Sequence, residues 1–260
     1  MTAFHYTMIH SSLPYGRKPP VTDFGGEGRI IILLHGFLSS SRYWKKLQPH
    51  LTRAGYRVIT IDLLGFGNAP RPRHSDYSYD AHVSYLHASI KDLHLSSPYI
   101  LIGHSMGALL AARYGRLHPG SVWTLILLHP PLYKDSAEAY ATLRATNRLY
   151  RFLLDSHYRR LGWALIKTFA GYYIRNHGRA ARERSLKNVI EKAEAFDDLK
   201  TISVRTMLIV GLKDRVEYAN NLVLHDISEA ITVFEEEVTH HSPIRSTDLV
   251  QERILYFLSH

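Results

Sequence analysis

Short, continuous apolar runs alternate with helical patterns along most of this chain, and this alternation constrains its fold more than any other feature. The runs cover residues 30–34, 57–61, 99–102, 122–128 and 206–210, with a weaker one at 231–234. Runs of this kind are typical of strands that are buried on both faces, as in a parallel sheet. Helical patterns lie at residues 41–53, 79–94, 106–118, 217–225 and 246–258. We therefore predict an α/β fold with a doubly wound, mostly parallel sheet.

The alternation is interrupted between residues 131 and 200, where three helical patterns follow one another without a strand. Asp135 and Glu138 have the spacing of a capping pair at the start of the first pattern. We predict that this segment is an all-helical cap, or lid, over the carboxyl edge of the sheet, where open α/β sheets bind ligands. The predicted domains are a core of residues 1–130 and 201–260 and a cap insertion of residues 131–200.

The composition of the chain excludes several classes of protein and of site. The chain has 260 residues, no cysteine and a net charge of +9. The lack of cysteine excludes disulfides, zinc–thiolate sites and a thiol nucleophile. We find no apolar run long enough for a membrane span, no secretory signal pattern and no nucleic-acid motif. We therefore expect a cytoplasmic protein that binds neither nucleic acid nor a membrane through a span, and the sequence leaves its oligomeric state open.

A serine lies between a predicted strand and a predicted helix, in the pentapeptide Gly103-His104-Ser105-Met106-Gly107. A glycine two positions to either side allows the backbone to make a tight, strained turn that exposes the serine hydroxyl. A glycine-rich strand–helix turn with an ordinary surface serine is the plainer interpretation of the pattern alone. The strand before it and the helix after it favour a nucleophile, which would need neighbouring groups to activate it.

A serine hydroxyl needs a base to take its proton and an acid to orient that base. Asp214 follows the apolar run 206–210 and would emerge at the same sheet edge as Ser105, although a turn aspartate that caps a helix would also fit. His240 and His241 follow the last strand pattern, and the pKa of histidine suits a base near neutral pH. The order serine, aspartate, histidine is that of one triad architecture. The pattern leaves open which histidine is the base.

An acyl-transfer reaction also needs N–H donors for the oxyanion of its tetrahedral intermediate. The backbone N–H of Met106, directly after the serine, is one candidate. The second must come from the loop after an earlier strand, and His35-Gly36-Phe37 lies directly after the run 30–34. We therefore predict the N–H of Phe37 as the second donor.

Together these pieces resemble the α/β-hydrolase superfamily over about residues 28–258, in the branch of carboxylesterase- and acylhydrolase-like proteins with a helical cap. The resemblance implies Ser105 as the nucleophile, Asp214 as the acid and a histidine of the pair as the base. The distance to the closing Phe257-Leu258 favours His240. The matching segments are His35-Gly36-Phe37, Asp62-Leu63-Leu64-Gly65-Phe66-Gly67, Gly103–Gly107, Gly211-Leu212-Lys213-Asp214 and Thr239-His240-His241-Ser242-Pro243.

The resemblance also implies that Asp62 is structural and holds the loop through Gly65 and Gly67. The activity expected is hydrolysis of a carboxylic ester or a similar acyl bond of a small molecule, through an acyl-Ser105 intermediate, without metal or organic cofactor. Carbon–carbon bond hydrolysis, acyl transfer or a lyase reaction on the same triad stays open, because fold and triad permit many chemistries. A ligand receptor that retains the scaffold without catalysis is the alternative from another class.

The predicted cap is basic. Between residues 134 and 200 the sequence has 14 basic and 8 acidic residues. The plainer interpretation is a solvated helical face. The sharper one is that the cap steers an anionic acyl substrate toward the serine.

Overall fold

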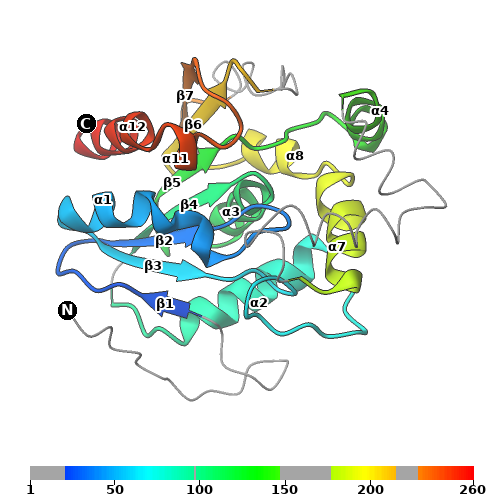
Figure 1. The fold of residues 1–260 in the computed structure, drawn as a ribbon, viewed down its shortest axis with the longest axis horizontal. Coiled ribbons are helices and arrows are strands. Elements are labelled where there is room, and N and C mark those ends of the chain that lie inside the picture. The colour runs from blue at the N-terminus through cyan, green and yellow to red at the C-terminus, as the bar shows by residue number, and fades with distance from the viewer. Residues whose placement is uncertain (1–20, 97, 147–176, 215–227) are drawn as a thin grey trace.

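One mixed sheet forms the centre of the computed structural model, which describes residues 21–96, 98–146, 177–214 and 228–260 (Figure 1). Its seven strands lie in the order β1-β3-β2-β4-β5-β6-β7. Neighbouring strands are parallel, except that β1 is antiparallel to β3. The predicted mostly parallel sheet is therefore confirmed. The strands are β1 (Val21–Asp23), β2 (Ile30–Leu34), β3 (Arg57–Ile61), β4 (Tyr99–His104), β5 (Val122–Leu128), β6 (Thr206–Gly211) and β7 (Ile231–Glu236).

The central strands are apolar throughout because both of their faces are covered. In β2, Ile30, Ile32 and Leu34 belong to one hydrophobic cluster, whereas Ile31 and Leu33 belong to another on the opposite face. Alternate side chains of a strand point to opposite faces, so a continuous apolar run fills two cores at once.

Helices form a layer on each side of the sheet (Figure 1). The helices α1 (Leu47–Arg53) and α12 (Thr247–Ser259) pack on one face and contact each other. The helices α2 (Tyr79–Lys91), α3 (Met106–Leu117) and α8 (Ala195–Lys200) pack on the other. This arrangement confirms the predicted α/β class and places the ends of the parallel strands at one common edge.

Local chemistry explains where the elements differ from the predicted ones. The predicted helix over residues 41–53 is divided into a 3₁₀ turn, η1 (Ser41–Lys45), and α1. Pro49 lacks the N–H that would bond to the carbonyl of Lys45, so a continuous α-helix cannot run through both. The strand β1 was not predicted, because three residues are too few for a periodic pattern. The predicted helix at residues 217–225 lies outside the described residues.

The described part of the segment between β5 and β6 consists of helices joined by turns and short loops, and it adds only an isolated bridge between His177 and Phe66. It contains α4 (Ser136–Thr146), α7 (Arg179–Ser185), a π-helical turn η2 (Leu186–Ile190) and α8. The Oδ1 atom of Asp135 accepts a hydrogen bond from the N–H of Glu138 at 2.8 Å, as the predicted capping pair requires. The second helical pattern predicted for this segment lies outside the described residues, and the division into core and cap stays a prediction. Among the described helices, none is long and apolar enough to cross a membrane.

Candidate active site

The turn from β4 into α3 holds Ser105 in a strained conformation. Its φ of 53° and ψ of −122° lie in a region that residues with a side chain rarely adopt. The N–H of Ser105 donates to the carbonyl of Leu128 at the end of β5, at 2.9 Å. A Cβ on Gly103 would lie 2.4 Å from the carbonyl oxygen of Gly107, and one on Gly107 would lie 2.4 Å from that of His35. Glycine is therefore required on both sides of the serine, as the pentapeptide predicts.

The loop after β2 lies against this turn. A Cβ on Gly36 would be 3.1 Å from the Cβ of Ser105, so the absence of a side chain allows the two backbones to approach. Phe37 follows directly on the same loop. Met106 is the first residue of α3, where a backbone N–H has no acceptor within the helix. Both residues expected to provide oxyanion donors are thus next to Ser105 or on the loop that contacts it, and their role stays a prediction.

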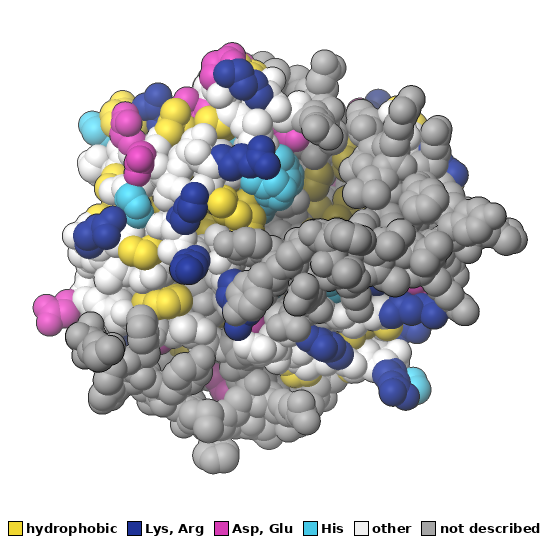
Figure 2. All heavy atoms as spheres, viewed as in Figure 1, with side chains coloured by type: hydrophobic (Ala, Val, Ile, Leu, Met, Phe, Trp, Pro, Cys, Tyr) yellow, Lys and Arg dark blue, Asp and Glu magenta, His cyan; other side chains and the backbone are white. Residues whose placement is uncertain are grey.

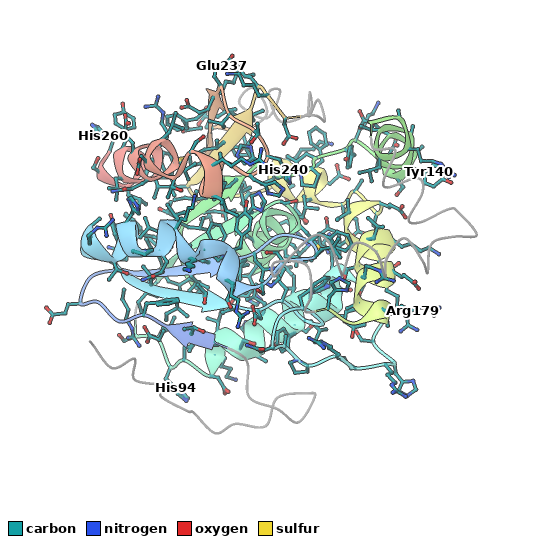
Figure 3. The ribbon with its side chains drawn as sticks, in the orientation of Figure 1. His94, Tyr140, Arg179, Glu237, His240 and His260 are labelled. Carbon is teal, nitrogen blue, oxygen red and sulfur yellow. The ribbon has the colours of Figure 1, made fainter. Side chains whose placement is uncertain are left out.

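Asp214 and His240 are joined by a hydrogen bond. The Nδ1 atom of His240 lies 2.7 Å from Oδ2 of Asp214, whose side chain is only 6% exposed. Figure 3 shows His240 near the centre of the view, on the segment that leads from β7 to α11 (Ser242–Arg245). Its ring lies 4.9 Å, between centroids, from the ring of His104, the residue before Ser105. The aspartate, the histidine and the serine turn are therefore brought to one place by three separate loops.

The neighbouring His241 has different surroundings. Its Nδ1 atom lies 3.3 Å from the hydroxyl oxygen of Tyr43, on η1, and no hydrogen bond between it and Asp214 is found among the described residues. Desolvation, followed by the nearby His240, lowers the pKa of His241. The contact with the aspartate distinguishes the two histidines where the sequence pattern left the choice open, and it favours His240 as the base.

Asp62 lies at the end of β3 and organises the loop that follows. Its two carboxylate oxygens accept hydrogen bonds from the N–H of Ser41 at 2.5 Å and that of Asn68 at 2.8 Å. Gly67 has a φ of 54°, and a Cβ there would lie 2.2 Å from the Asp62 carboxyl carbon. Gly65 has a φ of 86°. These contacts are those of a buried structural carboxylate, in agreement with the role that the resemblance implies for Asp62.

Comparisons with known proteins give the same fold over most of the chain. A family profile described as the alpha/beta hydrolase fold matches residues 29–152. The crystal structure of a bromoperoxidase from Bacillus anthracis is similar, with a TM-score of 0.71 and 26% sequence identity, over 92% of this chain and 95% of the other. An esterase from Exiguobacterium antarcticum gives a TM-score of 0.72 at 23% identity, over the same shares of the two chains. The chain has the α/β-hydrolase fold.

The curated relatives of this chain match it over a shorter region. A protein named probable lysophospholipase BODYGUARD 1, from Arabidopsis thaliana, is 33% identical over 123 residues. That region is 46% of this chain and 26% of the relative. The match therefore spans about a quarter of the relative's length and supports common ancestry of the matched part.

The contacts of His35, His129 and Tyr43 were not predicted from the sequence, although His35 belongs to the loop expected to supply an oxyanion donor. His35 links two loops, because its Nδ1–H donates to the carbonyl of Gly36 at 2.8 Å and its Nε2 accepts from the N–H of Leu63 at 3.0 Å. His129 directly follows β5 and has a φ of 52°. Its position at the end of an apolar run, on the same edge as Ser105, is the signal that could have found it. Tyr43 carries no comparable signal.

Ion pairs neutralise part of the excess positive charge between residues 134 and 200. Lys200 pairs with Asp197 at 2.7 Å, and Lys192 with Glu194 at 3.4 Å. Figure 2 shows Lys and Arg side chains spread over the visible face of the molecule rather than gathered in one block. In the described part the plainer interpretation, a solvated helical face, is favoured. Six of the basic residues lie outside that part: Arg148, Arg151, Arg159, Arg160, Lys167 and Arg175.

Proposed function

We propose that this protein is a serine hydrolase that cleaves a carboxylic ester, or a similar acyl bond, through an acyl-Ser105 intermediate. One observation carries the proposal: the 2.7 Å hydrogen bond between His240 and Asp214 lies beside a serine held at a φ of 53°. An ordinary surface serine would have no reason to adopt such a backbone conformation. A strained turn that is held by its surroundings is typical of a functional site.

In the proposed mechanism, the hydroxyl oxygen of Ser105 attacks the substrate carbonyl while Nε2 of His240 takes the hydroxyl proton. Asp214 accepts the Nδ1–H of the imidazole, which orients the ring and stabilises the imidazolium that forms. His240 then gives the proton to the leaving alcohol as the C–O bond breaks. A water molecule, deprotonated by His240, attacks the acyl-serine, releases the acid and regenerates the hydroxyl.

The negative charge of each tetrahedral intermediate would be stabilised by the backbone N–H groups of Phe37 and Met106. Two preorganised N–H donors in a site of low dielectric contribute several kcal/mol to such a step, since the loss of one donor costs about 3 kcal/mol. Gly36 supports this assignment, because its lack of a side chain allows the Phe37 loop to lie against Ser105.

We propose acyl esters of small molecules as the substrate class. The names of the relatives include lysophospholipases and an esterase, and both kinds of enzyme act on carboxylic esters. A screen should vary acyl length and charge separately, with neutral acyl esters, carboxylated esters and a single-chain phospholipid. Comparison of kcat/KM at low and high ionic strength tests the steering hypothesis, because a steering surface predicts greater salt sensitivity for the charged esters.

The nucleophile is tested with a fluorophosphonate probe, which reacts covalently with an activated serine. We expect the wild type to be labelled and Ser105→Ala to be unlabelled. Equal labelling of the two proteins, or none of the wild type, would exclude Ser105 as the nucleophile. The second outcome would favour the ligand receptor without catalysis. Labelling without ester turnover would favour carbon–carbon cleavage, acyl transfer or a lyase reaction on the same residues.

A further inference from the structure

Three consecutive residues of the loop between β7 and α12 are each held by a side chain from a different element. The carbonyl oxygen of His240 lies 2.8 Å from Nε2 of His104, at the end of β4. The ring of His241 faces Tyr43, and Oγ of Ser242 lies 2.6 Å from Nε2 of His129. A loop needs no such set of contacts merely to connect a strand to a helix. This set restrains the loop at and beside the proposed base.

The contact between His104 and the carbonyl oxygen of His240 shows which ring nitrogen of His104 carries the proton. A carbonyl oxygen can only accept, so the Nε2 atom of His104 carries the proton and donates it to His240. The Nδ1 atom is then unprotonated, and it has no hydrogen-bond partner in the described part of the chain. It faces Gly36, where a Cβ would lie 2.9 Å away. The side chain is therefore enclosed, with a single donor that is directed at the backbone of the proposed base.

Tyr43 packs against this histidine and extends the contacts to the next residue. Its ring is stacked on that of His104, with 4.5 Å between centroids. The Tyr43 hydroxyl oxygen lies 3.1 Å from Nε2 of His104 and 3.3 Å from Nδ1 of His241. Since Nε2 carries a proton, the hydroxyl directs its own proton toward His241. Burial raises the pKa of Tyr43 well above its ordinary value, so the hydroxyl keeps that proton.

His129 holds the far side of the same loop. It is 1% exposed, and its ring centroid lies 5.9 Å from that of His240. Its partner, Ser242, is the first residue of α11 and is fully buried. Residues 240 and 242 are therefore restrained from two neighbouring strand ends, β4 and β5, which also flank the Ser105 turn.

We propose that His104 and His129, with Tyr43, form a positioning clamp that holds the backbone of residues 240–242 so that the His240 ring faces Ser105. These are positioning residues, because they act on the loop and not on the reacting atoms. The proposal rests on the proposed function for its catalytic consequence. Misplacement of a catalytic group by about 1 Å is enough to reduce turnover on the order of 100-fold.

The experiment compares His104→Leu with His104→Gln. Leucine removes the donor, whereas the glutamine amide can donate to the same carbonyl from a similar distance. We expect His104→Leu to lower kcat on the order of 100-fold with little change in KM, and to slow fluorophosphonate labelling in parallel. His104→Gln should recover most of both. A purely structural role would lower thermal stability and the active fraction but would leave kcat per labelled site unchanged.

Amide hydrogen exchange over residues 240–246 gives a readout that does not need catalysis. We expect faster exchange there in His104→Leu and in His129→Leu than in the wild type. His118→Leu is the matched control, because His118 caps the other end of α3. Unchanged hydrogen exchange and unchanged kcat in both leucine variants would overturn the clamp. A loss of kcat in His104→Gln equal to that in His104→Leu would also overturn it. If the wild type is not labelled, the proposed function fails and exchange alone decides the clamp.

Discussion

Buried polar side chains are stabilised in two different ways in this molecule. Around the Ser105 turn, apart from the Asp214 carboxylate that pairs with His240, they are histidines and a tyrosine, joined by hydrogen bonds between neutral groups. Between α3 and α8 they are ions. The carboxylate of Asp198 is 4% exposed and accepts from Nε of Arg113 at 2.7 Å and from Nε of Arg116 at 2.6 Å. Arg113 also pairs with Glu194 at 2.7 Å.

The difference follows from what each region has to do. In the proposed mechanism His240 becomes positive, and a second positive charge within a few Å would oppose it. Burial, followed by the neighbouring His240, lowers the pKa of His104 well below its ordinary value and that of His129 to about 3. Both stay neutral near pH 7. The contact between α3 and α8 has no reacting group beside it, so it can use full charges to join a helix of the β5–β6 segment to the sheet layer.

The largest expected difference in turnover is that between two single variants, His240→Ala and His241→Ala. His240→Ala should lower kcat about 10³-fold or more, because a general base contributes roughly 10²–10⁴-fold and the acid Asp214 loses its partner as well. His241→Ala should retain most of the activity, since the structure places its ring against Tyr43 and not against Asp214. Single-turnover ester cleavage, normalised to probe-labelled sites, measures both. A greater loss of kcat in His241→Ala than in His240→Ala would make His241 the base. The comparison of the two regions would then lose its basis, because it assumes that His240 becomes positive.

Much of the architecture could be predicted from the sequence, because it depends on periodic signals. Six of the seven strands and the helices on both faces follow from continuous apolar runs and helical spacing. The exception, β1, has three residues and too little pattern to detect. The strained turn at Ser105 was predictable because only glycine fits at positions 103 and 107, and this requirement is visible in the sequence.

The contacts around the proposed base could not be predicted in the same way. Tyr43 lies on a short 3₁₀ turn, and its distance from His104 and His241 depends on how η1 packs over the sheet edge. The choice between His240 and His241 depends on which ring faces Asp214, and adjacent residues in a loop have no periodicity that would show it. Seventeen histidines in the chain make a single one uninformative until the fold brings it to a partner.

The charged region can be tested with two neighbouring aspartates. Asp198→Asn should lower the free energy of unfolding by about 2 kcal/mol, because Arg113 and Arg116 lose the buried carboxylate that they share, although Arg113 keeps its pair with Glu194. Asp197→Asn is the matched control. Asp197 is 71% exposed and pairs with Lys200 on the surface, so its loss should cost less than about 0.5 kcal/mol. Urea unfolding at pH 7 measures both.

Ester turnover of the folded Asp198→Asn variant tests whether the ion pairs between α3 and α8 are independent of the proposed site. We expect turnover close to that of the wild type, because the ion pairs lie along α3 beyond its first turn and touch no residue of the proposed site. Equal stability of the two asparagine variants would show that the buried ions contribute no more than surface pairs. The Ser105 region and the α3–α8 contact would then differ in the arrangement of their polar groups but not in the contribution of those groups to stability.

The smallest effect concerns a buried neutral histidine away from the proposed site. His82 of α2 is 1% exposed, and its Nε2 atom lies 2.9 Å from Oγ of Ser185 on α7. Desolvation, followed by the nearby His35, lowers the pKa of His82 to about 3. Below about pH 6.5 the unfolded chain therefore binds a proton at His82 that the folded protein does not bind. The free energy of unfolding is unaffected by His82 above that pH and decreases as the pH falls below it.

Between pH 7 and 5.5 this linkage should cost about 1 kcal/mol for one such histidine. His82→Gln keeps a polar side chain but cannot titrate, so its free energy of unfolding should fall by about 1 kcal/mol less than that of the wild type over the same interval. His94→Gln is the control, since His94 is exposed and lies at the periphery of the molecule (Figure 3). Parallel pH curves for the wild type and His82→Gln would mean that His82 is charged when buried. The neutral state of the buried histidines around Ser105 would then not extend to α2, and the difference between that region and the rest of the fold would be larger.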